Sequence, residues 1–149
     1  MTLLQQYAKY RLQVMLAASV VLAGCASPPP SASLFDRLGG LPVITAVVDK
    51  EVDAHVADPR TRRVFVGVNL KTLKASIVAM TCVATGGPCK YTGEPKMANA
   101  HRGLSITSEE FDVSIGQISD ALDELHVAAR EKKELLGILM PMKVDIVGR

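Results

Sequence analysis

Apolar side chains recur every three or four residues through most of the chain beyond residue 40, which is the spacing of one face of an α-helix. In the first such stretch, Ile44, Val48, Val52 and His55 fall on one stripe. No stretch of useful length shows the alternation typical of a β-strand. The pattern predicts an all-helical domain, with helices over residues 41–57, 70–85, 95–102, 108–125 and from about 130 onward.

Signals at the helix ends agree with these ranges. Asn69 is a typical N-cap for the second helix, and Gly86-Gly87-Pro88 stops it. Thr107 and Glu110 have the spacing of a capping box at the start of the fourth. Pro141 should kink the last helix, because proline removes a backbone hydrogen bond.

Residues 1–24 have the layout of a signal peptide. Lys9 and Arg11 precede an uncharged apolar run of about 13 residues, whereas a helix needs roughly 20 to cross a bilayer. A short uncleaved anchor is the alternative. The run ends in Leu22-Ala23-Gly24-Cys25, which resembles the lipobox of bacterial lipoproteins. That resemblance implies cleavage before Cys25 and lipid on its sulfur.

Residues 25–33 are rich in proline and serine and should form an extended tether, which leaves residues 34–149 as the folded domain. The expected location is therefore outside the cytoplasm, on a bacterial membrane. Ala26 follows Cys25 where an aspartate would oppose sorting to the outer membrane, by resemblance to Gram-negative lipoproteins. In a Gram-negative host, the domain would face the periplasm or sit at the outer membrane.

An oxidising compartment would also change how Cys82 and Cys89 are interpreted. A disulfide across the six residues between them and two free thiols are both open. No second cysteine or histidine pair flanks them, so this spacing does not indicate a metal site.

Charge excludes one class of partner. The chain carries 17 basic and 15 acidic residues, and without Lys9 and Arg11 the count is 15 against 15. A neutral domain lacks the basic surface that phosphate neutralisation requires, so no nucleic acid is expected as a partner. Aromatic residues make up 4% of the chain and tryptophan is absent, so the core should be aliphatic.

Residues 33–148 resemble a group I truncated haemoglobin. The resemblance is carried by motifs in the family's order: Leu34-Phe35-Asp36-Arg37-Leu38-Gly39-Gly40, Ala57-Asp58-Pro59, Val64-Phe65, Gly86-Gly87-Pro88, Tyr91-Thr92-Gly93, and Met97 with His101. It implies a truncated globin fold, a two-over-two helical sandwich around haem, with His101 as the proximal ligand to the iron. It also implies that Phe65 packs flat on the haem and that apolar residues form its walls, namely Val52, Leu73, Ile77, Met97, Ile106, Phe111 and Ile115.

The sequence departs from the family where the gas would bind. Group I members usually have Phe-Tyr on the first long helix and often glutamine on the facing helix, and here those places hold Glu51-Val52 and Ile77. A hydrogen bond to bound oxygen is worth about 1.5 to 3 kcal/mol, so its loss should weaken oxygen binding tenfold or more. His55 could serve as an alternative donor or sixth ligand, or simply pack near Phe65.

The leading functional hypothesis is a haem-binding globin of the envelope that takes up oxygen, nitric oxide or carbon monoxide. The resemblance also implies a possible conversion of nitric oxide to nitrate, which would need an unidentified reductase. The absence of the family's tyrosine argues against this activity. One alternative is a haem-free degenerate globin that acts as a lipid-tethered interaction module. Another is electron transfer or haem trafficking with His55 as a second iron ligand.

Overall fold

The structure, a computed structural model, describes residues 32–149. The expected signal peptide, the lipidation site Cys25 and most of the tether lie outside the described residues. The elements in chain order are α2 (Leu34–Leu38), α3 (Gly40–Ala57), η1 (Arg62–Phe65), α4 (Leu70–Ala84), α5 (Met97–Ala100), α6 (Ser108–Glu124), α7 (Ala129–Leu139), η2 (Met140–Met142) and α8 (Lys143–Ile146).

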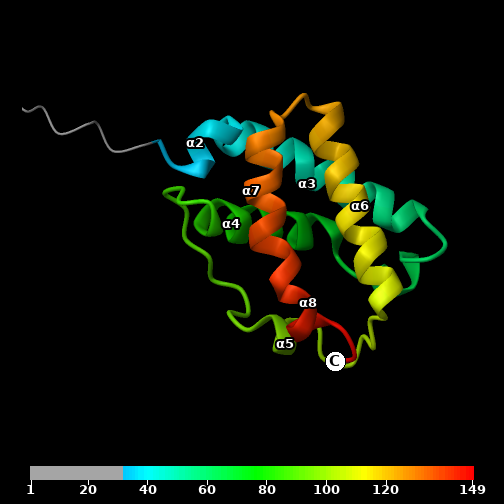
Figure 1. The fold of residues 1–149 in the computed structure, drawn as a ribbon. Helices are drawn as coiled ribbons and strands as arrows, with labels where there is room; N and C mark the ends of the chain where they lie inside the picture. The colour runs from blue at the N-terminus through cyan, green and yellow to red at the C-terminus, as the bar shows by residue number, and fades with distance from the viewer. Residues whose placement is uncertain (1–31) are drawn as a thin grey trace, which may run out of the picture. The chain divides into compact units, whose positions relative to one another are not determined.

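Two helix pairs form two layers. Helices α6 and α7 run in front of α3 and α4, and α3 packs against both α4 and α6 (Figure 1). Across residues 32–149 the only extended pairing is an isolated bridge between Ile106 and Val147. The expected all-helical, two-over-two architecture is confirmed.

The predicted capping residues perform that role. The Asn69 side chain accepts a hydrogen bond from the Thr72 amide at 3.1 Å at the start of α4. At the start of α6, the Thr107 hydroxyl accepts from the Glu110 amide at 3.1 Å, and the Glu110 carboxylate accepts from the Thr107 amide at 2.8 Å. Each side chain satisfies an amide that has no partner within its helix.

Three elements differ from the expectation. Helix α2 was not predicted, and a second capping box, between Ser33 and Asp36, begins it. The helix expected over 95–102 is shorter, at Met97–Ala100. Pro141 does more than kink the last helix: α7 ends at Leu139 and the chain continues as the separate turns η2 and α8, because proline cannot donate the hydrogen bond that would extend α7.

Two glycines fix how α2 meets its neighbours. Gly39 has φ of 100° and serves at once as the C-cap of α2 and the N-cap of α3, a conformation that costs glycine little. A Cβ at Gly87 would lie 2.5 Å from Cδ2 of Phe35 and 2.6 Å from Sγ of Cys82. Only glycine therefore lets α2 pack on the end of α4.

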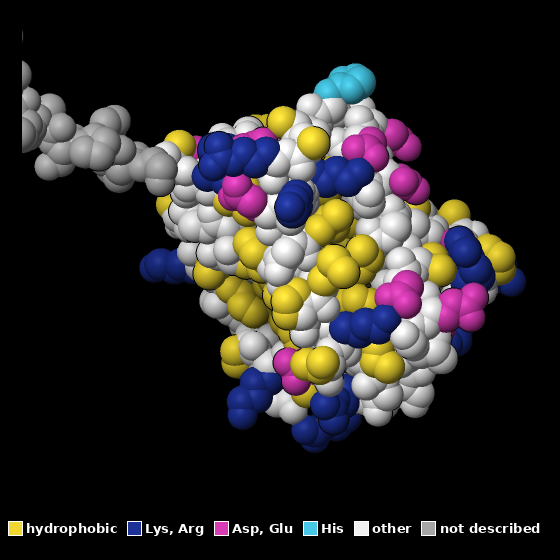
Figure 2. Space-filling view, in the orientation of Figure 1, with side chains coloured by type: hydrophobic (Ala, Val, Ile, Leu, Met, Phe, Trp, Pro, Cys, Tyr) yellow, Lys and Arg dark blue, Asp and Glu magenta, His cyan; other side chains and the backbone are white. Residues whose placement is uncertain are grey.

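The buried core consists of separate clusters. One joins α2, α3, α6 and α7 through Leu38, Val47, Leu122 and Leu135. The other lies between α3 and α4 around Ile44, Val48 and Val52. On the face drawn in Figure 2, hydrophobic side chains gather over the middle and charged side chains lie mainly around them. None of the helices within residues 32–149 combines the length and apolarity needed to cross a membrane.

Candidate functional site

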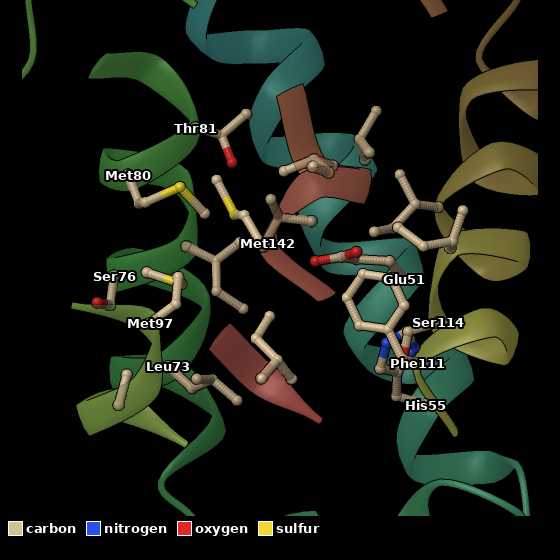
Figure 3. Close-up of a pocket in the computed structure, with 18 of the residues that line it drawn as sticks. Glu51, His55, Leu73, Ser76, Met80, Thr81, Met97, Phe111, Ser114 and Met142 are labelled. Atoms are coloured by element: carbon tan, nitrogen blue, oxygen red, sulfur yellow. The ribbon is translucent and has the colours of Figure 1, made fainter. Parts of the chain in front are cut away.

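A cavity of about 510 Å³ lies inside the helical sandwich, a volume typical of small-molecule sites. Helices α3, α4 and α6, the α5 segment and the end of the chain all contribute to it, and most of its lining is apolar (Figure 3). All but one of the residues predicted to contact haem line it: Phe65, Leu73, Ile77, Met97, His101, Ile106, Phe111 and Ile115. Residues far apart in the sequence are thus brought to one space, and their contact with haem remains a prediction.

Val52 is the exception among them, and its contact with haem stays a prediction. Val52 is 1% exposed but lies outside the cavity lining, packed with Ile44, Val48 and side chains of α4. Its neighbour Glu51 lines the cavity instead. Successive residues on a helix point about 100° apart, so the rotation of α3 about its own axis determines that Glu51, and not Val52, lines the cavity. The α3 wall of the cavity consists of Ile44, Val47, Val48, Glu51 and His55.

His101 follows α5 and has the hydrogen bonding expected of an axial metal ligand. Its Nδ1 lies 2.8 Å from the Met97 carbonyl oxygen, which accepts a hydrogen bond when Nδ1 carries the proton. That tautomer leaves Nε2 with its lone pair free. Metal-binding histidines commonly donate their other ring N–H to a backbone carbonyl, since this fixes the ring and its tautomer.

Arg63 holds the segment that follows His101. Its guanidinium donates to both carboxylate oxygens of Glu110 at 2.6 Å, and to the carbonyl oxygens of Leu104 and Ser105 at 2.9 Å. This bidentate pairing lowers the pKa of Glu110. It joins η1, the chain after His101 and the start of α6. Sequence reasoning missed this clamp, because 47 residues separate Arg63 from Glu110 and neither belongs to a motif.

A disulfide holds the other end of the same segment. Cys82, near the end of α4, is bonded to Cys89 with the Cα atoms 5.9 Å apart. Of the two alternatives for these cysteines, the structure has the bridge. It shortens the free loop that leads to α5, so His101 is attached to the scaffold from both sides.

His55 lines the cavity beside Phe65, with the two rings in an edge-on arrangement and their centroids 5.6 Å apart. Its side chain is buried, and its Nδ1 has no hydrogen-bond partner. Burial lowers the pKa of His55, while the Glu51 carbonyl, the Gln117 side chain and the Asp58 charge act in the opposite direction. The ring is therefore neutral at physiological pH.

Glu51 is the strongest electrostatic feature of the site. It is 7% exposed, and burial raises its pKa to about 7. In Figure 3 its carboxyl group points into the space bordered on the far side by Leu73 and Met80 of α4. The sequence offered a signal for this residue, since a glutamate within an apolar helical stripe is unusual.

The residues present fit haem. Most of the cavity lining is apolar, and His101 is part of that lining with one ring nitrogen, Nε2, left over from its contact with the Met97 carbonyl. No group of three or more His, Cys, Asp or Glu side chains that could hold a bare metal ion occurs in the part of the chain that the structure describes. A mostly apolar site with His101 at its edge suits an iron whose other ligands come from a porphyrin.

Comparison with known proteins agrees with this geometry. A model of the bacterial-like globin family matches residues 33–147. A group 1 truncated hemoglobin, GlbN of Mycolicibacterium paratuberculosis, is 35% identical over 77% of this chain and 84% of its own length. GlbN of a Nostoc species is 28% identical over 78% of this chain and 98% of its own.

Solved structures show the same fold. The 2/2 hemoglobin of a Synechococcus species, with covalently attached heme, has a TM-score of 0.73 at 27% identity and covers 79% of this chain and 100% of its own. Truncated hemoglobin of Tetrahymena pyriformis has a TM-score of 0.75 at 24% identity, with the same coverage, which supports the fold alone. Family membership implies a haem cofactor, which the cavity fits. The chain belongs to the bacterial-like globin family, as a truncated globin.

Proposed function

We propose that this protein binds haem through His101 and takes up oxygen or another diatomic gas at the bacterial envelope. The observation that carries the proposal is the His101 ring, held through Nδ1 by the Met97 carbonyl at the edge of an apolar cavity of about 510 Å³. Haem, when bound, supplies an iron that takes a diatomic gas as ligand.

The chain's own residues divide the remaining work. His101 would provide the ring nitrogen that holds the haem iron, and the Arg63 clamp and the Cys82–Cys89 disulfide would keep its segment in place. Apolar side chains, including Leu73, exclude water from the cavity. Apart from Glu51 and His55 on α3, the protein groups around the iron would then be mostly of low polarity.

The wall opposite α3 favours gas binding over turnover of nitric oxide. Ile77, on α4, lines the cavity where relatives often have glutamine, and it donates no hydrogen bond. Conversion of nitric oxide and oxygen to nitrate also consumes one electron per turnover, which an external reductase would have to supply. We therefore propose gas binding or sensing ahead of nitric oxide turnover as the function.

The envelope location rests on the sequence. Lys9 and Arg11, the apolar run behind them and the Leu22-Ala23-Gly24-Cys25 motif support export and lipid on Cys25. The lipid would hold the protein at the membrane and the tether would separate the domain from its surface. Sensitivity of signal-peptide processing to globomycin, with Cys25→Ala as the control variant, tests whether Cys25 carries lipid.

Haem titration of the purified protein tests the cofactor. A Soret band shifted from that of free haem and saturating at one haem per chain is expected. A protein that folds as stably without haem as with it, and produces no shift, would favour the haem-free interaction module instead.

A further inference from the structure

The Glu51 carboxylate has no partner. It is 7% exposed, and among residues 32–149 no hydrogen bond or ion pair of this carboxylate is found, so burial alone raises its pKa. It nevertheless points into the cavity (Figure 3). A buried ionisable group without a partner is costly to the fold, so its retention calls for an explanation in terms of function.

A second unsatisfied group lies one helical turn further along α3. His55 Nδ1 is buried without a partner, and so is the Oε1 atom of Gln117 on α6. These atoms are complementary when Nδ1 carries the proton, and the Gln117 side chain is close enough to raise the pKa of His55. Buried atoms of this kind normally have a partner.

Beyond Gln117, polar groups continue to the surface. The Gln117 amide nitrogen donates to the Asp58 carboxylate at 3.0 Å. The Arg60 guanidinium donates to the same carboxylate at 2.6 Å and lowers the pKa of Asp58 to about 2. Arg60 and Gln117 also line an open depression on the outside of the molecule. Polar side chains thus run from the cavity to solvent.

We propose that Glu51 and His55 make the α3 wall a proton-exchanging site, so that a small inorganic anion binds in the cavity together with one proton, which arrives from the surface past Gln117 and Asp58. The inference rests on the proposed function, because the haem iron would hold the anion. The ligand class is a small anion with acceptor atoms, such as azide.

The charge of Glu51 explains why anion binding would be coupled to proton uptake. An ionised Glu51 repels an anion in the same apolar cavity, where charges are weakly screened. A protonated Glu51 instead offers an O–H donor to the anion. Burial raises the pKa of Glu51 to about 7, so both forms are present near neutral pH.

The other ionisable groups around the cavity are occupied. Glu110 is paired with Arg63, and the Tyr91 hydroxyl donates to the Glu94 carbonyl at 3.0 Å. His101 is bonded to the Met97 carbonyl. From α4, Lys74 pairs with Asp49 and Asp53 away from the cavity, and on the α8 side Lys143 pairs with Asp112. Among the described groups, Glu51 and His55 remain for proton exchange.

Azide titration of the ferric, haem-loaded protein tests the proposal. In the wild-type protein, the Kd for azide should rise by about tenfold per pH unit above neutrality, the slope for uptake of one proton. In Glu51→Gln, the slope should be lost. Competition from hydroxide affects both proteins, so the difference between their slopes is the quantity to measure.

Matched controls separate the causes. Asp53→Asn removes an exposed carboxylate of the same helix and should keep the wild-type slope. Carbon monoxide, a neutral ligand of the ferrous protein, should bind without pH dependence in every variant. Equal azide slopes in wild type and Glu51→Gln, with haem bound in both, would overturn the proposal and leave the proposed haem function standing. Failure to bind haem would overturn the proposed function instead.

Two further measurements keep the test independent of one variant. If Glu51→Gln does not fold, the wild-type protein should still show an infrared band of a protonated carboxyl group that disappears as pH rises through neutrality and shifts when azide binds. A band insensitive to azide would overturn the coupling. Gln117→Leu should keep the equilibrium slope and slow the response of azide binding to a pH jump; an unchanged rate would remove the path from the proposal.

Discussion

The two sides of the cavity are held in different ways. On the His101 side, every conspicuous polar group has a partner: the His101 ring bonds the Met97 carbonyl, Arg63 bonds Glu110, and Cys82 is joined to Cys89. On the α3 wall, the Glu51 side chain is buried, with burial as the sole cause of its raised pKa, and the buried His55 Nδ1 has no hydrogen-bond partner.

Under the proposed haem function, this difference would separate the groups that hold the cofactor from the groups that tune it. Satisfied hydrogen bonds and covalent links fix a geometry, which an axial ligand requires. Unsatisfied buried groups cost stability and are retained chiefly at functional sites. The His101 side is thus the one with paired polar groups, and the α3 wall, where Glu51-Val52 departs from the family, is where this protein's own chemistry should lie.

The largest effect is expected from His101→Ala. Loss of the axial nitrogen should lower haem affinity by more than about a hundredfold, since changes to groups that merely orient a metal ligand already cost 10- to 100-fold. A Soret titration measures this. His126→Ala, which removes an exposed histidine, is the control and should bind haem as the wild type does. If both variants bound haem equally, the assignment of His101 would be wrong.

Glu51→Gln should act on stability in a pH-dependent way. The pKa of Glu51 is raised from 4.5 to about 7 in the folded protein, so the folded state binds a proton that the unfolded state has already released. Stability from this group is complete below about pH 4.5 and is lost as pH rises through about 7. At about pH 8, the variant should be more stable than the wild type by up to about 3 kcal/mol.

Urea unfolding of the haem-free protein at acid and alkaline pH measures this gain. Near pH 4.5 the two proteins should differ little, because Glu51 is then neutral in the folded state. A gain of the same size at both pH values would show that the effect comes from packing and not from charge.

Much of the fold could be predicted from local chemistry. The ends of α4 and α6 follow from Asn69 and Thr107, because capping depends on residues within one turn. Which of Glu51 and Val52 lines the cavity could not be predicted, because this depends on how α3 packs against α4. The contacts of Arg63 with Glu110 and of Gln117 with Asp58 join distant segments, so no local pattern indicates them.

The disulfide offers a smaller test on the His101 side. Cys82→Ser with Cys89→Ser should lower the unfolding free energy by about 2.5 kcal/mol, as expected for opening a loop of this length. Reduction of the wild-type protein should produce the same loss, which makes the reduced wild type the control. Haem should still bind, because the Met97 carbonyl and the Arg63 clamp remain. A stability unaffected by either treatment would mean that the clamp alone holds this segment.

The smallest effect concerns the gas, and it tests whether residue 77, on the α4 wall opposite α3, can by itself supply a hydrogen bond to bound oxygen. Ile77→Gln places an amide donor on the cavity wall, and a hydrogen bond to oxygen should slow oxygen dissociation about tenfold. Val83→Gln makes the same change on the exposed face of α4 and should leave the rate unchanged. Stopped-flow dissociation of oxygen from the ferrous protein measures both. If oxygen dissociated from Ile77→Gln at the same rate as from Val83→Gln, the gas would be bound out of reach of residue 77. The polar atoms that decide which ligand is retained would then be those of Glu51 and His55.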